Sequence, residues 1–239
     1  MGSVGGEDAI CRLLARACKM RLVSVEYHIA PKHRYPQALD DCVTATLCSL
    51  KHFSQEKVIL LGGSVGGNLA FGNALKLIDQ GQGSKVKGIA AMVLVTVHPS
   101  AIPPQLKDKY TASEEHAFHT INTKAAMEVF FDTYGALPKD KYTSCLLHSL
   151  LKDLPRTYIA ESGADTLRDD ARLMKEALEQ AGVEVKYDSD EGYPHYSWTF
   201  PSKHLVEHQA HFFGNLILAI TWINPIGHSN IVRSSVSEA

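Results

Sequence analysis

The sequence lacks an excess of either charge, a long apolar run and the composition of a disordered chain. Its 239 residues include 24 lysines and arginines against 26 aspartates and glutamates, for a formal charge of −2. This balance removes the electrostatic reason to expect a nucleic-acid or anionic-membrane partner. Since 45% of the residues are apolar and 21% are charged, the chain has enough material for a core. We therefore expect one folded domain, residues 1–239, that binds a small molecule.

The cysteines fit neither a disulfide framework nor a zinc ribbon. Their number is odd and none has CxxC spacing; they are Cys11, Cys18, Cys42, Cys48 and Cys145. Reduced thiols in an intracellular, cytoplasmic protein are expected. The histidines at 204, 208 and 211 share a helical face but have no carboxylate arranged with them as in a metal motif. We therefore predict no metal site and no cofactor.

No segment reads as a signal peptide or a membrane span. The first ten residues, MGSVGGEDAI, lack a basic start followed by an apolar stretch. The longest stretch without Asp, Glu, Lys or Arg covers residues 208–232, but its apolar part, residues 216–223, is too short to cross a bilayer. We expect this part to be a core-packed terminal helix.

Short apolar runs alternate with helical periods along the chain. The runs predict strands at 22–27, 58–61, 89–97, 157–160 and 183–187. The periods predict helices at 9–17, 38–53, 68–80 and 168–181, the last ended by Gly182. Because such runs are apolar on both faces, the predicted fold class is α/β, a three-layer α/β/α sandwich around a mostly parallel sheet.

Residues 98–154 interrupt this alternation. The segment contains Pro99, Pro103 and Pro104, and one helix is expected at 123–134. Ligands bind at the carboxyl ends of strands in such sheets, so we expect a helical cap insertion over that edge. Its aromatic residues can line an apolar pocket, although side chains at helical spacing more often form core; they are Phe118, Phe130, Phe131 and Tyr134. No substrate-binding residue is assigned.

The sequence from Gly62 to Gly66, GGSVG, matches the pattern G-x-S-x-G. An expected strand precedes it and an expected helix follows it, which is the setting that a nucleophilic serine turn requires. Glycines beside Ser64 let the backbone bend and let the helix pack close to the sheet. A phosphate-binding loop is the alternative, but no lysine follows Gly67 and the GxGxxG spacing is absent.

A serine nucleophile needs a histidine base held by a carboxylate. Asp165 follows the expected strand at 157–160 and is the best placed acid; an N-cap or turn aspartate is its alternative interpretation. His195 lies in a loop after the last expected strand and is the candidate base. The order Ser64, Asp165, His195 is the order of nucleophile, acid and base in α/β-hydrolases.

Three segments resemble the hormone-sensitive-lipase branch of the α/β-hydrolase superfamily. Residues 23–41 resemble its V-S-V-D-Y-R-L-A-P-E-H-x-x-P-A-A-x-x-D segment. Residues 62–67 resemble its G-D-S-A-G-G, and residues 163–169 its G-x-x-D-x-L-R-D. The resemblance carries the catalytic roles onto Ser64, Asp165 and His195. The sequence around His195, GYPHYSWTFPS, is similar to that of fungal secondary-metabolism esterases. The resemblance also allows a homodimer.

The chain departs from that family in two ways. It contains no H-G-G-G loop, which in the family supplies oxyanion-hole donors, so we expect an amino-terminally truncated fold in which the N–H of Val65 is the remaining donor. Removing one such donor lowers rates on the order of 10²–10³-fold. Gly63 and Val65 also stand where the family usually has Asp and Ala.

Three functions follow from this sequence. The first is a serine carboxylesterase or lipase-like hydrolase that cleaves small to medium acyl esters through an acyl-enzyme on Ser64, with His195 as base and Asp165 orienting it. The second is a truncated or non-catalytic hydrolase-like protein that binds a ligand. The third is acyl transfer, because the same acyl-enzyme can react with an alcohol or amine instead of water.

Overall fold

A parallel sheet lies at the centre of the computed structural model, which describes residues 4–118 and 122–225. Its strands are β1 (Val58–Gly63), β2 (Val86–Met92), β3 (Thr157–Ser162) and β4 (Val185–Asp190). They are hydrogen-bonded in the order β1-β2-β3-β4, and every pair is parallel. Since all four carboxyl ends meet at one edge, the residues that follow the strands are brought together there.

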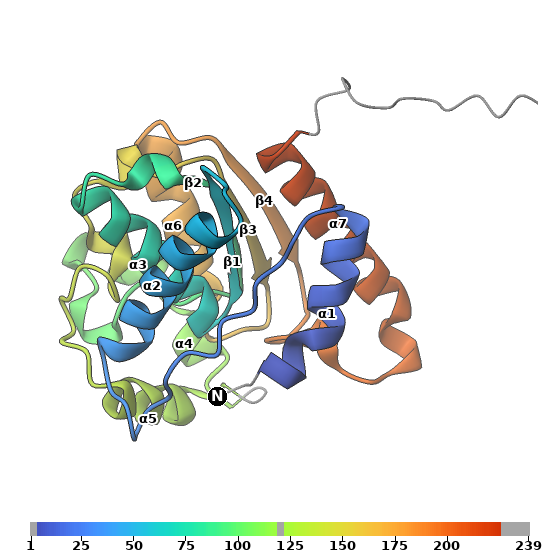
Figure 1. Ribbon diagram of the computed structural model, residues 1–239. Helices are drawn as coiled ribbons and strands as arrows, with labels where there is room; N and C mark the ends of the chain where they lie inside the picture. Colours follow the sequence, from blue (N-terminus) through green and yellow to red (C-terminus); the bar gives the residue numbers. More distant parts are fainter. Residues whose placement is uncertain (1–3, 119–121, 226–239) are drawn as a thin grey trace, which may run out of the picture.

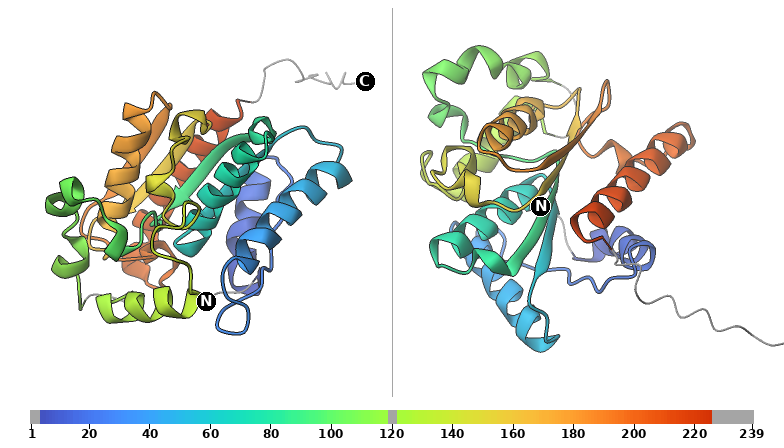
Figure 2. Two further views of the ribbon diagram at one scale, coloured as in Figure 1. Left: turned by 90° about the vertical axis from the view of Figure 1, so that its left-hand side faces the viewer. Right: turned by 90° about the horizontal axis from the view of Figure 1, so that it is seen from above.

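Helices cover both faces of this sheet (Figure 1). One face carries α2 (Gln37–His52), α3 (Val65–Asp79) and α6 (Arg168–Gln180), and the other carries α1 (Val4–Ala17) and α7 (Val206–Ile223). The view from above separates the two helical layers clearly (Figure 2). The predicted three-layer α/β/α class and the terminal helix are therefore confirmed.

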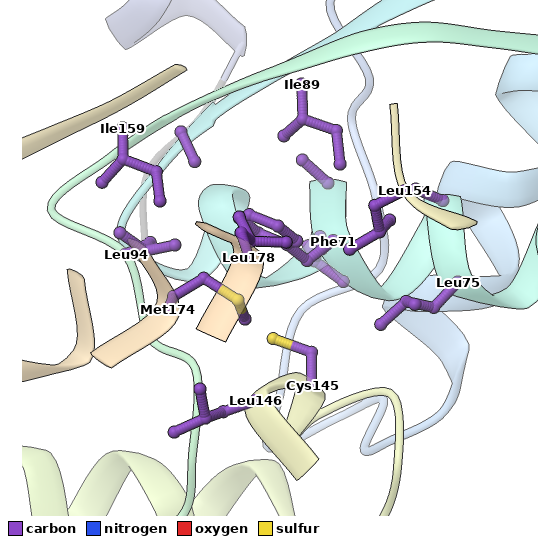
Figure 3. Close-up of a cluster of buried hydrophobic side chains, with 14 of the residues drawn as sticks. Phe71, Leu75, Ile89, Leu94, Cys145, Leu146, Leu154, Ile159, Met174 and Leu178 are labelled. Carbon is purple, nitrogen blue, oxygen red and sulfur yellow. The ribbon is translucent and has the colours of Figure 1, made fainter. Parts of the chain in front are cut away.

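The alternation of side chains along the strands builds two cores. In β2, Ile89 and Ala91 pack toward α2, α3 and α6, whereas Ala90 and Met92 pack toward α1 and α7. Phe71 of α3 and Met174 and Leu178 of α6 fill the first core with Ile89 (Figure 3). Strands apolar on both faces are expected in a parallel sheet covered on both sides.

The strand predicted at residues 22–27 is absent. The segment is extended but forms no sheet pairing among the described residues, and Leu22 and Val23 are partly exposed. A cavity lined by both this segment and β1 separates them, so no ladder of hydrogen bonds can form. The local pattern favoured a strand, but a strand also needs a neighbour.

The strand predicted at 89–97 ends early, at Met92. Val93 has a φ of 41°, which turns the chain out of the extended conformation. The N–H groups of Thr96 and Val97 then donate to Asp170 Oδ1, at 2.6 and 3.2 Å. Asp170 is fully buried and its Oδ2 accepts from the hydroxyl of Tyr110, at 2.6 Å. One buried carboxylate therefore fastens the start of the 98–154 segment to α6.

That segment contains short helices rather than strands in its described part. Its α-helices are α4 (Ala112–Glu115) and α5 (Lys124–Tyr134), and the longest of the 3₁₀ helices around them is Pro104–Lys109. Both helices lie at the end of the sheet where α3 begins (Figure 1). Helix α5 is N-capped by Thr123, whose hydroxyl accepts from the N–H of Ala126, and ends at Gly135 with a φ of 73°.

Candidate active site

Ser64 sits in a strained turn between β1 and α3. Its φ of 54° and ψ of −122° are rare for a residue with a side chain, and its N–H donates to the backbone oxygen of Met92 at 2.8 Å. A Cβ on Gly62 would lie 2.2 Å from the backbone oxygen of Gly66, so a side chain at 62 is excluded. The turn raises the Ser64 hydroxyl above the carboxyl end of β1, as its motif predicted.

The three side chains predicted from the sequence meet at this edge. His195 Nε2 lies 3.1 Å from Ser64 Oγ, and His195 Nδ1 lies 2.7 Å from Asp165 Oδ2. His195 and Asp165 are buried. Since a carboxylate can only accept, a neutral His195 carries its proton on Nδ1 and presents an unprotonated Nε2 to the serine hydroxyl. This is the arrangement in which a histidine can remove a proton from serine.

Backbone hydrogen bonds tie the loop of the acid to the loop of the base. The N–H of Gly163 donates to the backbone oxygen of Asp190 at 3.0 Å, and that of Ala164 donates to the backbone oxygen of Tyr193 at 3.0 Å. Behind the base, the ring of His208 stacks on Tyr193 with centroids 3.7 Å apart, and its Nε2 lies 2.8 Å from Ser197 Oγ. Asp165 and His195 are therefore held as one unit.

No sequence motif predicts the role of a fourth residue, Asn122. Its Nδ2 donates to Asp165 Oδ1 at 2.6 Å, and that oxygen also accepts from the N–H of Leu167 at 3.0 Å. The bond from Leu167 is typical of a turn aspartate, which was the alternative interpretation of Asp165. The carboxylate therefore both holds this turn and contacts His195. Asn122 comes from the 98–154 segment, far from Asp165 in sequence, and only the folded chain brings them together.

A backbone donor is available beside the nucleophile. Val65 is the first residue of α3, where a helical N–H has no partner one turn earlier, and no acceptor for it exists in the described part of the chain. Donors of this kind can stabilise an oxyanion. This is the N–H that was predicted for the oxyanion hole, and its catalytic role stays a prediction.

An open cavity contains Ser64 and His195. Phe130, Phe131 and Tyr134 of the 98–154 segment line it, whereas Phe118 is 93% exposed and does not line it, so including Phe118 among pocket or core residues was wrong. The cavity continues past the catalytic edge between β1 and residues 19–30. Its volume of about 1690 Å³ exceeds that of ordinary small-ligand pockets, so a ligand of ordinary size would fill only a part of it.

The part of the chain that the structure describes contains neither a metal-binding cluster nor a membrane-spanning helix. Within residues 4–118 and 122–225, no three His, Cys, Asp or Glu side chains gather as ligands of a metal ion. Over the same ranges, no helix has the length and apolar character needed to span a bilayer. The cytoplasmic location and the homodimer stay predictions.

Several known proteins resemble this chain over most of its length. Residues 1–199 match a family model described as alpha/beta hydrolase fold. A versiconal hemiacetal acetate esterase of Aspergillus parasiticus is 55% identical over 224 residues, which cover 94% of this chain and 71% of the relative. A hyperthermophilic esterase from the archaeon Pyrobaculum calidifontis has a TM-score of 0.83 and 25% identity, over 93% of this chain and 73% of that one.

A further relative is much longer than this chain. The FAD-linked oxidoreductase pytB of Aspergillus terreus is 53% identical over 224 residues, which cover 94% of this chain but 28% of the relative. The chain thus spans between about a quarter and three quarters of the length of these known proteins.

Proposed function

Since the chain belongs to the alpha/beta hydrolase fold family, we propose that it is a carboxylic ester hydrolase whose nucleophile is Ser64. The observation that carries the proposal is the continuous chain of contacts from Ser64 Oγ to His195 at 3.1 Å and from His195 to Asp165 at 2.7 Å. The relatives named as esterases support the same chemistry.

The proposed reaction proceeds through an acyl-enzyme. His195 Nε2 takes the proton of Ser64 as Oγ attacks the ester carbonyl carbon, and the N–H of Val65 donates to the oxyanion that forms. The same proton then passes to the departing alkoxide, the carbon–oxygen bond breaks, and the acyl group stays on Ser64. Water then attacks the acyl group on Ser64, with His195 as the base that takes its proton, and the carboxylic acid is released as the proton returns to Ser64 Oγ. Asp165 orients His195 and stabilises its imidazolium, and Asn122 positions Asp165.

The substrate that we propose is a small to medium acyl ester, with an acetate ester supported by the name of the relative from Aspergillus parasiticus. The insertion at 98–154 would act as the cap that lines its pocket, because Phe130 and Phe131 face the cavity that contains Ser64. Acyl transfer to an alcohol uses the same intermediate. Product analysis with an added alcohol distinguishes the two: an ester product indicates transfer, and acid alone indicates hydrolysis.

Hydrolysis of p-nitrophenyl acetate and butyrate tests the proposal. We expect turnover by the wild-type protein, and a loss on the order of 10⁴-fold in Ser64→Ala and His195→Ala. Ser84→Ala is the matched control, because Ser84 is exposed in the turn before β2, away from the carboxyl edge. A fluorophosphonate probe should label Ser64, as located by mass spectrometry. Equal rates for wild type and Ser64→Ala would contradict the proposal, and labelling without turnover would indicate the non-catalytic alternative.

A further inference from the structure

A second histidine, His98, lines the same cavity as Ser64 and takes no part in the proposed reaction. It is the first residue of the 98–154 segment and lies five residues after Val93, where the chain turns out of β2. Asn68, on the first turn of α3, donates from Nδ2 to the backbone oxygen of Val95 at 3.0 Å. The chain leading to His98 is thus fastened beside the turn that carries Ser64.

His98 is held through its ring and through its backbone. Its ring lies against Phe131 of α5, with centroids 4.7 Å apart and an interplanar angle of 56°. The backbone N–H of His98 donates to Ser144 Oγ at 3.0 Å. Phe131 also lines the cavity, so the His98 ring forms part of the wall that the insertion contributes.

Ser100 fixes the position of the proton on this ring. The backbone N–H of Ser100 donates to His98 Nδ1 at 3.2 Å, and Ser100 Oγ lies 2.9 Å from the same nitrogen. A backbone N–H can only donate, so Nδ1 is unprotonated and a neutral His98 carries its proton on Nε2. Burial lowers the pKa of His98, although nearby Asp132 opposes this effect, which favours the neutral ring.

The proton on Nε2 has no acceptor within residues 4–118 and 122–225. His98 also forms no ion pair there, unlike His195, which has Asp165. A neutral imidazole whose N–H has no acceptor, and which forms no ion pair with a carboxylate, is suited to donating a hydrogen bond rather than to removing a proton.

We propose that His98 is a substrate-binding residue whose Nε2–H donates to an oxygen of the ester outside the group that is cleaved. The substrate class is an ester with an apolar body against Phe131 and a second oxygen acceptor, such as a ketone. This inference rests on the proposed function, because it concerns the same pocket.

The tautomer can be tested without any turnover. In a ¹⁵N–¹H spectrum of the histidine rings at pH 8, we expect Nε2 of His98 to be protonated and Nδ1 to be unprotonated. His98→Gln identifies the signal through its loss. Protonation on Nδ1 would overturn the proposal, whether or not the protein hydrolyses esters.

Substrate preference tests the contact itself. The probes are phenyl acetate and three acetylphenyl acetates, with the ketone ortho, meta or para. The value of kcat/KM for each ketone ester is divided by that for phenyl acetate, so the electronic effect of the ketone cancels between enzymes. We expect this ratio to fall about fivefold in His98→Phe for at least one ketone ester, the effect of one hydrogen bond between neutral groups. His98→Gln, which keeps an N–H donor, should restore part of it.

His204→Phe is the matched control, because His204 is exposed and does not line the cavity. Unchanged ratios in His98→Phe for all three ketone esters would overturn the proposal. If the wild-type protein hydrolyses none of the esters, the proposed function fails. Calorimetry then measures the dissociation constants of the same esters with Ser64→Ala and with Ser64→Ala carrying His98→Phe, and each ketone ester is again compared with phenyl acetate. Equal ratios there, or no binding of any ketone ester, would also overturn the role of His98.

Discussion

The hydroxyl of Tyr196 occupies the space into which a side chain at Gly63 would extend. A Cβ on Gly63 would lie 2.3 Å from that oxygen and 2.8 Å from the ring carbon that bears it. Gly63 precedes the candidate nucleophile and Tyr196 follows the candidate base, so this contact joins the two loops next to the reacting groups. Tyr196 has a φ of 57°, and its ring packs between His195 and Trp198, at 5.1 and 5.0 Å.

Gly63→Ala should therefore destabilise the protein by about 2 kcal/mol, because the added methyl overpacks a filled space. Removing the hydroxyl with Tyr196→Phe makes room, so the cost of Gly63→Ala should be smaller by about 1 kcal/mol in that background. Denaturant unfolding of the four proteins of this double-mutant cycle measures the difference. Additive costs would show that the hydroxyl does not limit what residue 63 can be.

Asn122→Ala should lower kcat about 10-fold with little change in KM. It removes the bond of 2.6 Å to Asp165 Oδ1, and a hydrogen bond to a charged group contributes about 1.5–3 kcal/mol. Steady-state kinetics with phenyl acetate provide the measurement. Asn122→Asp should lower kcat further, because it places a second negative charge against Asp165.

Asn215→Ala is the matched control, since Asn215 lies on α7 and, among the residues that the structure describes, its amide hydrogen-bonds only to His211, at 3.1 Å. Unfolding curves of Asn122→Ala should stay two-state, which separates a positioning effect from loss of fold. A kcat within twofold of wild type would contradict the role of Asn122.

Asp170 should make stability depend on pH in the sense opposite to most carboxylates. Burial raises the pKa of Asp170 to about 6 from 3.8, so between these values the folded state binds more protons than the unfolded state. The stability that Asp170 contributes is therefore fully present below about pH 4 and is lost as the pH rises through about 6. The shift corresponds to about 3 kcal/mol.

Free energies of unfolding from pH 4 to pH 8 measure this effect as the difference between wild type and Asp170→Asn. Asparagine keeps an acceptor oxygen for the N–H groups of Thr96 and Val97 and cannot ionise. We expect wild type to lose stability relative to Asp170→Asn as the pH rises. A constant difference would show that the four hydrogen bonds to this carboxylate offset its burial.

The features that could be predicted from the sequence are those that depend on residues close together in the chain. The turn at Ser64 could be predicted because glycines on both sides and a strand–helix boundary are visible in a few residues. The segment 22–27 has the composition of a strand but no neighbour to pair with, and Val93 ends a strand that its apolar sequence would continue. Asn122 and Tyr196 could not be found, because their roles exist only through contacts with residues distant in sequence.

The bond from Asn122 to Asp165 also limits how freely the insertion can be exchanged. A loop grafted from a relative to alter substrate choice would remove the Asn122 amide that donates to Asp165, so selectivity and turnover would change together. Engineering of this scaffold is therefore better directed at single wall positions such as Phe130 than at replacement of the whole segment. A loop can be exchanged as a module only if it makes no contact with the catalytic residues, and the 98–154 segment contacts Asp165.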